Sequence, residues 1–174
     1  MPKTKAEIIE RLNRERATLV ERYRALTPDE LVAPCTESEA PDGTPWSAKD
    51  HLAHLLRIEE AFLAMAKRTL GGEVAPVRFS GTSREEAIAG VHRDNERHVS
   101  SLRDRSLDDL LGDLDVARQA TLAFLADATD EHLATPIPGA PWGDGTIGGV
   151  LLTNAYHERG HLAWVDEGLA SLGG

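Results

Sequence analysis

The stretch SAKDHLAHLLRIEEAFLAM, residues 47–65, shows how this chain folds. Ser47 stands three residues before Asp50, so its hydroxyl can accept a first-turn N–H while the carboxylate faces the positive end of the helix dipole. Apolar residues then recur at every third or fourth position, which places them on one helical face. We therefore predict an amphipathic helix over residues 48–70, followed by two glycines.

The same start signal and the same spacing recur along the chain. Four further hydroxyl residues precede an acid by three positions: Thr4, Thr27, Ser83 and Ser106. Helical stripes of apolar residues predict further helices over 5–26, 107–127 and 147–169, and a more polar helix over 84–104. No segment alternates as a strand would. We predict one all-α domain spanning residues 1–174, a four-helix bundle whose single long crossover carries the polar helix on the outside.

The composition narrows the classes of function. Asp and Glu number 29 against 19 Lys and Arg, giving a net charge of −10 that disfavours nucleic-acid binding. No apolar run reaches the length of a membrane span, and the amino-terminus leads directly into a charged helix. Cys35 is the single cysteine, so no internal disulfide can form. We expect a cytoplasmic protein in which this thiol is incidental.

The motif HERGH, residues 157–161, matches the zinc-binding helix pattern H-E-x-x-H. Two histidines four residues apart lie on one helical face and can hold one divalent ion. Alone, the motif suggests a metallopeptidase with Glu158 as general base. That class needs a further ligand downstream, but Trp164 stands where glycine is required and no histidine follows His161. The third ligand must therefore come from upstream.

The predicted helix over 48–70 offers that ligand. His54 lies among leucines, so its side chain faces the interior, where a histidine can be either a hydrogen-bonded core residue or a ligand. Helix bundles build metal sites from residues on facing helices. His54, His157 and His161 would leave a fourth position open to water or substrate.

Two further residues are candidates for a catalytic role. Thr153 lies one turn before His157 and could hydrogen-bond to a bound water. Glu158 is rotated by about 100° from His157 and could act as a base, but we expect it to face solvent.

The string GDGTIG, residues 143–148, matches the dinucleotide pattern G-x-G-x-x-G, but prolines rather than a strand precede it. We interpret it as a flexible loop before the last helix. The histidines on polar segments are expected at the surface: His92, His98 and His132.

The segments WSAKDHLAHL (46–55) and NAYHERGH (154–161) resemble the DinB-like superfamily, which includes the amino-terminal domain of mycothiol-dependent maleylpyruvate isomerase. The layout is also similar to its ClbS/DfsB-type branch. The resemblance implies a nickel or zinc site whose ligands are the histidine eight residues after Trp46 and the histidine pair of the last helix, here His54, His157 and His161. His51 falls outside this pattern, and we expect it beside the ligands or at the surface. The resemblance also implies a homodimer.

We therefore expect a metal-dependent enzyme acting on a small molecule. The resemblance implies thiol-dependent transferase or isomerase chemistry, with a low-molecular-weight thiol as a second cofactor, or hydrolase chemistry. One alternative is a non-catalytic protein that sequesters a small molecule, indicated by aromatic residues near the helix ends. These are Trp46, Trp142, Tyr156 and Trp164. The metallopeptidase is a third and weaker hypothesis.

Overall fold

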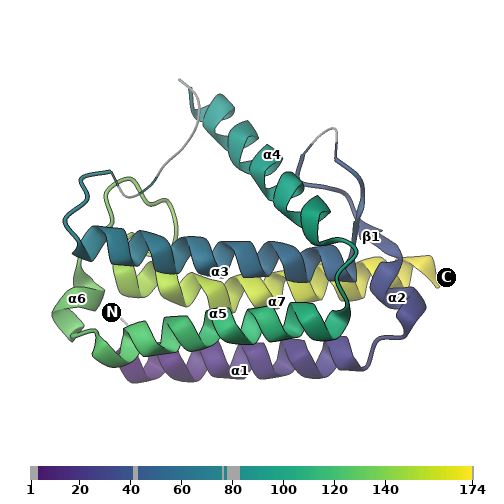
Figure 1. The fold of residues 1–174 in the computed structure, drawn as a ribbon, viewed down its shortest axis with the longest axis horizontal. Helices are drawn as coiled ribbons and strands as arrows, with labels where there is room; N and C mark the ends of the chain where they lie inside the picture. The colour runs from purple at the N-terminus through teal and green to yellow at the C-terminus, as the bar shows by residue number, and fades with distance from the viewer. Residues whose placement is uncertain (1–3, 41–42, 76, 78–82, 174) are drawn as a thin grey trace.

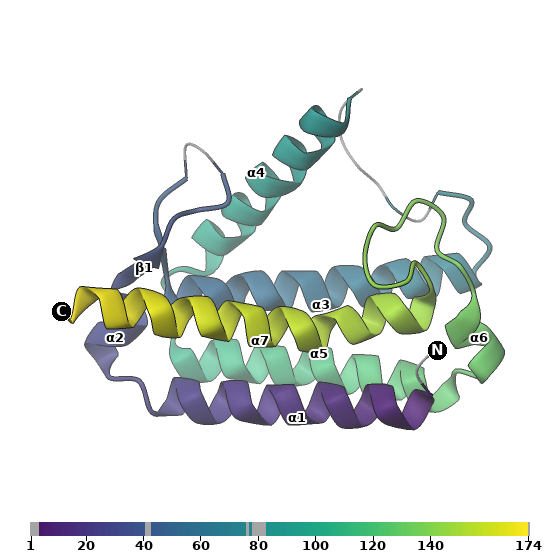
Figure 2. The same cartoon turned by 180° about the vertical axis from the view of Figure 1, so that it is seen from behind.

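The computed structural model describes residues 4–40, 43–75, 77 and 83–173. Four long helices lie side by side and form a bundle (Figure 1): α1 (Lys5–Arg24), α3 (Ala48–Leu70), α5 (Leu107–Asp127) and α7 (Ile147–Leu172). The first and last run in one direction and the middle two in the other (Figure 2). The predicted all-α four-helix bundle is confirmed. None of the described helices combines the length and apolarity needed to cross a membrane.

The long crossover between α3 and α5 carries the additional helix α4 (Arg84–Leu102), as predicted. It packs against α3 and projects away from the bundle at an angle (Figures 1 and 2). The remaining elements are short: α2 (Pro28–Val32), α6 (Asp130–Ala134), β1 (Pro34–Thr36) and β2 (Trp46–Ser47). The sequence pattern did not indicate this short antiparallel β1–β2 pair. Strands of two or three residues are too short to show an alternating pattern.

The helix starts follow the local sequence signals. Each of the five predicted hydroxyl caps accepts a hydrogen bond from the backbone N–H three residues later. At Thr4, Thr27 and Ser47 the acidic side chain also returns to the backbone of the cap residue. Such reciprocal bonds satisfy donors that would otherwise lack a partner at a helix start.

The apolar core of the bundle consists of two clusters. The cluster nearer the β1–β2 hairpin includes Leu19, Tyr23, Leu52, Leu110 and Val165. The cluster at the opposite end includes Ile8, Leu12, Phe62, Leu125 and Leu151. The residues between them, near the middle of each long helix, are charged.

This charged layer takes one residue from each bundle helix: Arg16, Glu59, Arg118 and Glu158. Arg118 Nε donates to Glu59 Oε1 at 2.7 Å, and its Nη2 donates to Glu158 Oε1 at 2.9 Å. Arg16 Nε donates to Glu158 Oε1 at 2.8 Å, and Arg16 also pairs with Glu59. All four residues are buried, so water cannot stabilise their charges. The negative charge of each carboxylate is instead stabilised by both guanidinium groups.

The substitution Arg118→Met should destabilise the bundle strongly, because it leaves two buried carboxylates sharing one arginine. We expect the free energy of unfolding in urea to fall by about 3 kcal/mol. The matched control is Arg22→Met, which breaks a half-exposed pair with Asp166 and should cost about 0.5 kcal/mol. Equal losses for both variants would show that the charged layer contributes no more than a surface ion pair.

Candidate metal centre

Three histidines converge where α3 packs against α7. His157 Nε2 lies 3.3 Å from His54 Nε2 and 2.9 Å from His161 Nε2. The three atoms that could act as ligands lie within 4.8 Å of one another. His54 comes from the second turn of α3, while the other two occupy successive turns of α7. The structure thus brings together the three histidines singled out in the sequence.

The chemistry of this donor set fits a divalent ion. Burial lowers the pKa of His157 to about 4, and burial together with the neighbouring imidazoles places the pKa values of His54 and His161 lower still. All three rings are therefore neutral at neutral pH, the form in which imidazole binds metals. Nitrogen ligands of a tetrahedral zinc ion lie about 3.4 Å apart, close to the two distances from His157 Nε2 to Nε2 of His54 and of His161.

His51 lies beside the ligand candidates and not at the surface. It is 1% exposed, and its Nδ1 is 2.7 Å from Nδ1 of His161. Its Nε2 is 2.9 Å from the hydroxyl oxygen of Thr36 on β1. If His161 presents Nε2 to an ion, its Nδ1–H donates to His51, which in turn donates Nε2–H to Thr36. A chain of this kind sets the tautomer and the ring orientation of a ligand.

Glu39 is a site residue that the sequence analysis missed. Its Oε1 lies 3.8 Å from His54 Nε2, and its Oε2 accepts a 2.9 Å hydrogen bond from Asn95 Nδ2 on α4. Glu39 lies in the connection between β1 and β2, which we call the hairpin segment, whereas Asn95 lies on α4, far away in sequence. No spacing pattern could have predicted this carboxylate, because only the tertiary fold places it next to His54.

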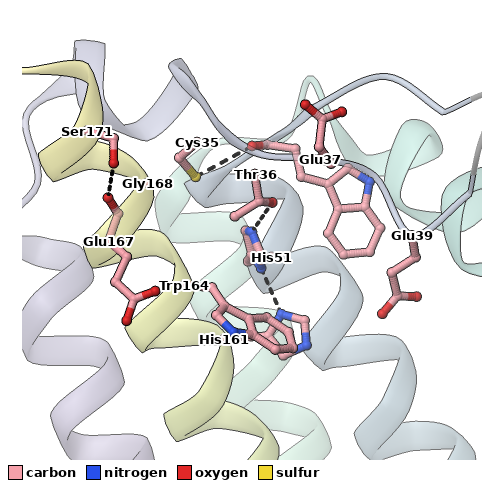
Figure 3. Close-up of a pocket in the computed structure, with 11 residues that line it drawn as sticks. Cys35, Thr36, Glu37, Glu39, His51, His161, Trp164, Glu167, Gly168 and Ser171 are labelled. Atoms are coloured by element: carbon pink, nitrogen blue, oxygen red, sulfur yellow. Dashed lines mark hydrogen bonds between the residues drawn. The ribbon is translucent and has the colours of Figure 1, made fainter.

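Two cavities flank the histidines and meet at Glu39. The first, which we call the hairpin cavity, has a volume of about 380 Å³ and lies between the hairpin segment and α7 (Figure 3). His51 and His161 line it, together with Trp46 and Trp164. The second, which we call the α4 cavity, has about 170 Å³ and is lined by His54 and His157. A small molecule could thus reach the cluster from either side.

Thr153 and Trp142 line the α4 cavity. The Thr153 hydroxyl donates to the carbonyl of Gly149, so its oxygen can still accept a hydrogen bond. His92, which is half-buried, also lines this cavity, a position that its polar sequence surroundings did not indicate.

The other residues singled out in the sequence lie elsewhere. His98 is half-buried as well, whereas His132 is exposed as expected. Tyr156 contributes to neither cavity; its ring lies near the guanidinium groups of Arg11 and Arg159. Gly143 and Gly145 adopt positive φ angles in the loop before α7, and the last two residues of GDGTIG already belong to that helix.

The expectation that Glu158 faces solvent is wrong. It is 2% exposed, and the 100° turn from His157 directs its side chain between Arg16 and Arg118. Burial raises its pKa, and the two arginines oppose that change. Glu158 lines neither cavity, so its position argues against the general base of a metallopeptidase.

Comparison with known proteins supports the same fold. A family model described as the DinB superfamily matches residues 38–165, a span that includes the three histidines and Glu39. The crystal structure of an uncharacterised protein from Escherichia coli UTI89 is similar over 99% of this chain and 96% of its own, with a TM-score of 0.69 and 15% sequence identity. At that identity the likeness concerns the fold alone. A search among curated proteins found no match.

The metal-free protein should lose stability as the pH falls below about 6.5. The unfolded histidines take up protons near that pH, whereas the buried rings of His51 and His157 stay neutral down to about 4. Stability is therefore present above pH 6.5 and falls toward pH 4, by about 1 kcal/mol for each buried histidine at pH 5.5. Urea unfolding at pH 7.5 and 5.5 measures this loss. His157→Asn should reduce it, while His132→Asn, at an exposed position, should leave it unchanged.

The Cys35 thiol should react slowly with iodoacetamide at pH 7.5. Burial is the main cause that raises its pKa to about 11, and its sulfur donates weakly to the carbonyl of Trp46. Because the thiolate is the nucleophile, the reaction should accelerate as the pH rises toward 11. Mass spectrometry of this single thiol gives the rate, and the protein unfolded in guanidinium is the control. Equal rates in the folded and unfolded protein at pH 7.5 would contradict this expectation.

Proposed function

This chain belongs to the DinB superfamily, and we propose that it is a metal-dependent enzyme that acts on a small molecule. The observation that carries the proposal is the meeting of three neutral imidazoles, two buried and one half-buried, at a common point between two cavities. We assign His54, His157 and His161 as ligands of a divalent ion, nickel or zinc. Such an ion would supply Lewis-acid chemistry and lower the pKa of a coordinated water or thiol. The reaction classes that fit are thiol-dependent S-transfer or isomerisation, and hydrolysis.

The surrounding residues have distinct parts in this proposal. His51 and Thr36 orient His161 through their chain of hydrogen bonds. Glu39 has Oε1 next to His54 and can accept a proton or a hydrogen bond from a group held beside the cluster. Thr153 offers an acceptor on the opposite side, in the α4 cavity. These groups together position a reactant without a strong base of the H-E-x-x-H type.

A protein that binds a small molecule without turnover is the second candidate. The hairpin cavity favours it, because Trp46 and Trp164 supply aromatic walls and Trp164 remains 52% exposed. The number of product molecules per chain separates the two candidates. An enzyme supplied with an electrophile and a low-molecular-weight thiol exceeds one turnover, whereas a sequestering protein stops at one bound molecule. For either candidate we propose a cytoplasmic homodimer.

Metal analysis tests the proposal directly. Protein purified without chelator or a metal-affinity tag should contain about one nickel or zinc ion per chain by native mass spectrometry and elemental analysis. His157→Ala should lose the ion while keeping its helical circular dichroism spectrum. His132→Ala, at an exposed site on α6, should retain it. Wild-type protein that neither contains nor binds nickel or zinc would refute the assignment.

A further inference from the structure

We propose that the substrate carries a positively charged amino group, and that Glu39 or Glu167 holds this group in the hairpin cavity. The inference rests on the proposed function, because it takes the histidine cluster as the reacting centre. It assigns the substrate class, which the three histidines by themselves leave open.

The charge of the hairpin cavity is the first observation. Its lining includes the carboxylates of Glu37, Glu39 and Glu167, and no lysine or arginine of the described chain lines it. No hydrogen bond or ion pair joins the Glu37 or Glu167 carboxylate to another residue of the described chain, and Ser171 bonds only to the backbone carbonyl of Glu167. Glu39 faces an imidazole that burial keeps neutral. None of the described residues that line the cavity carries a positive charge that would compensate these three carboxylates, and Arg57 is linked to Glu39 through Asn95.

The Glu39 carboxylate is held in place before any ligand binds. Asn95, which is 4% exposed, donates its amide to Oε2, and Arg57 Nε donates to the Asn95 carbonyl at 3.2 Å. This leaves Oε1 directed toward the histidines as an acceptor. A carboxylate fixed in this way attracts an ammonium group and repels an anionic one without reorganisation.

The positions of the two acids suit a small ligand. Figure 3 shows Glu39 and Glu167 on either side of the His51–His161 pair. A molecule with its reactive end at His161 can thus place an amino group near one carboxylate or the other. The cavity volume of about 380 Å³ is at the lower end of the range for small-molecule sites.

The aromatic walls and the α7 dipole favour the same charge. Trp164 lies with its ring centroid 4.8 Å from that of His161, and about half of its surface is exposed. Aromatic faces attract ammonium groups. Glu167, Gly168 and Ser171 place the cavity wall at the carboxyl end of α7, where the helix dipole is negative. A carboxylate or phosphate group placed beside Glu39 or Glu167 would be repelled, whereas the divalent ion that the histidines would hold attracts an anionic group, such as a thiolate, at the other end of the ligand.

Two thiols with the same two-carbon spacer between sulfur and the charged group provide the test. Cobalt(II)-loaded protein is titrated with cysteamine, which carries an ammonium group, and with 3-mercaptopropionate, which carries a carboxylate, and the thiolate-to-cobalt charge-transfer band gives each Kd. We expect wild-type protein to bind cysteamine at least about tenfold more tightly. The two thiols differ in their own acidity, so the decisive quantity is the change of the Kd ratio on substitution.

Glu39→Gln and Glu167→Gln should each reduce that ratio by about threefold, and the double variant should reduce it further. Glu21→Gln is the matched control, since it removes one exposed charge on α1 and should leave the ratio unchanged. The cobalt spectrum without thiol verifies that each variant retains the ion. An unchanged ratio in the double variant, or tighter binding of 3-mercaptopropionate by the wild type, would overturn this inference alone. Failure of the wild type to bind cobalt would overturn it together with the proposed function.

Discussion

We infer that the buried layer of two arginines and two glutamates sets the alignment of the bundle helices. Taking four charges out of water is costly, and such a layer does not stabilise a fold more than apolar packing would. Its effect is on register, because sliding one helix by a turn would leave a buried charge without its partner. Glu158 follows His157 directly, and Glu59 lies five residues after His54. We infer that the pairing of these glutamates with the same two arginines also aligns α3 with α7, so that the histidines meet.

The properties of the histidine cluster follow from its depth. Burial keeps the imidazoles neutral, so their lone pairs are available to an ion at neutral pH. The hydrogen bond between His51 and His161 orients the His161 ring. The hairpin segment places the Glu39 carboxylate next to His54. Core, charged layer and cluster therefore form one continuous arrangement, in which residues near the middle of the bundle position those that face the cavities.

Much of this arrangement was predictable from local sequence. A hydroxyl residue three positions before an acid acts within one helical turn, so Thr4 and Ser47 marked helix starts without reference to the rest of the chain. Two histidines four residues apart likewise lie on the same face of a helix, wherever that helix packs. The position of Glu158 was predicted wrongly, because a polar residue next to a charged one in sequence is usually solvated. Only the arginines on α1 and α5 explain why it is buried.

The sequence alone determined the five long helices, their order, the single crossover and the set of three candidate histidines, because each depends on spacing within one segment or on an ordered set of short motifs. The tertiary structure decided which polar groups surround those histidines. Glu39 on the hairpin segment, Asn95 on α4 and His51 on α3 meet at the cluster from three separate elements. Contacts between such distant segments arise from packing, and no periodicity along the chain encodes them.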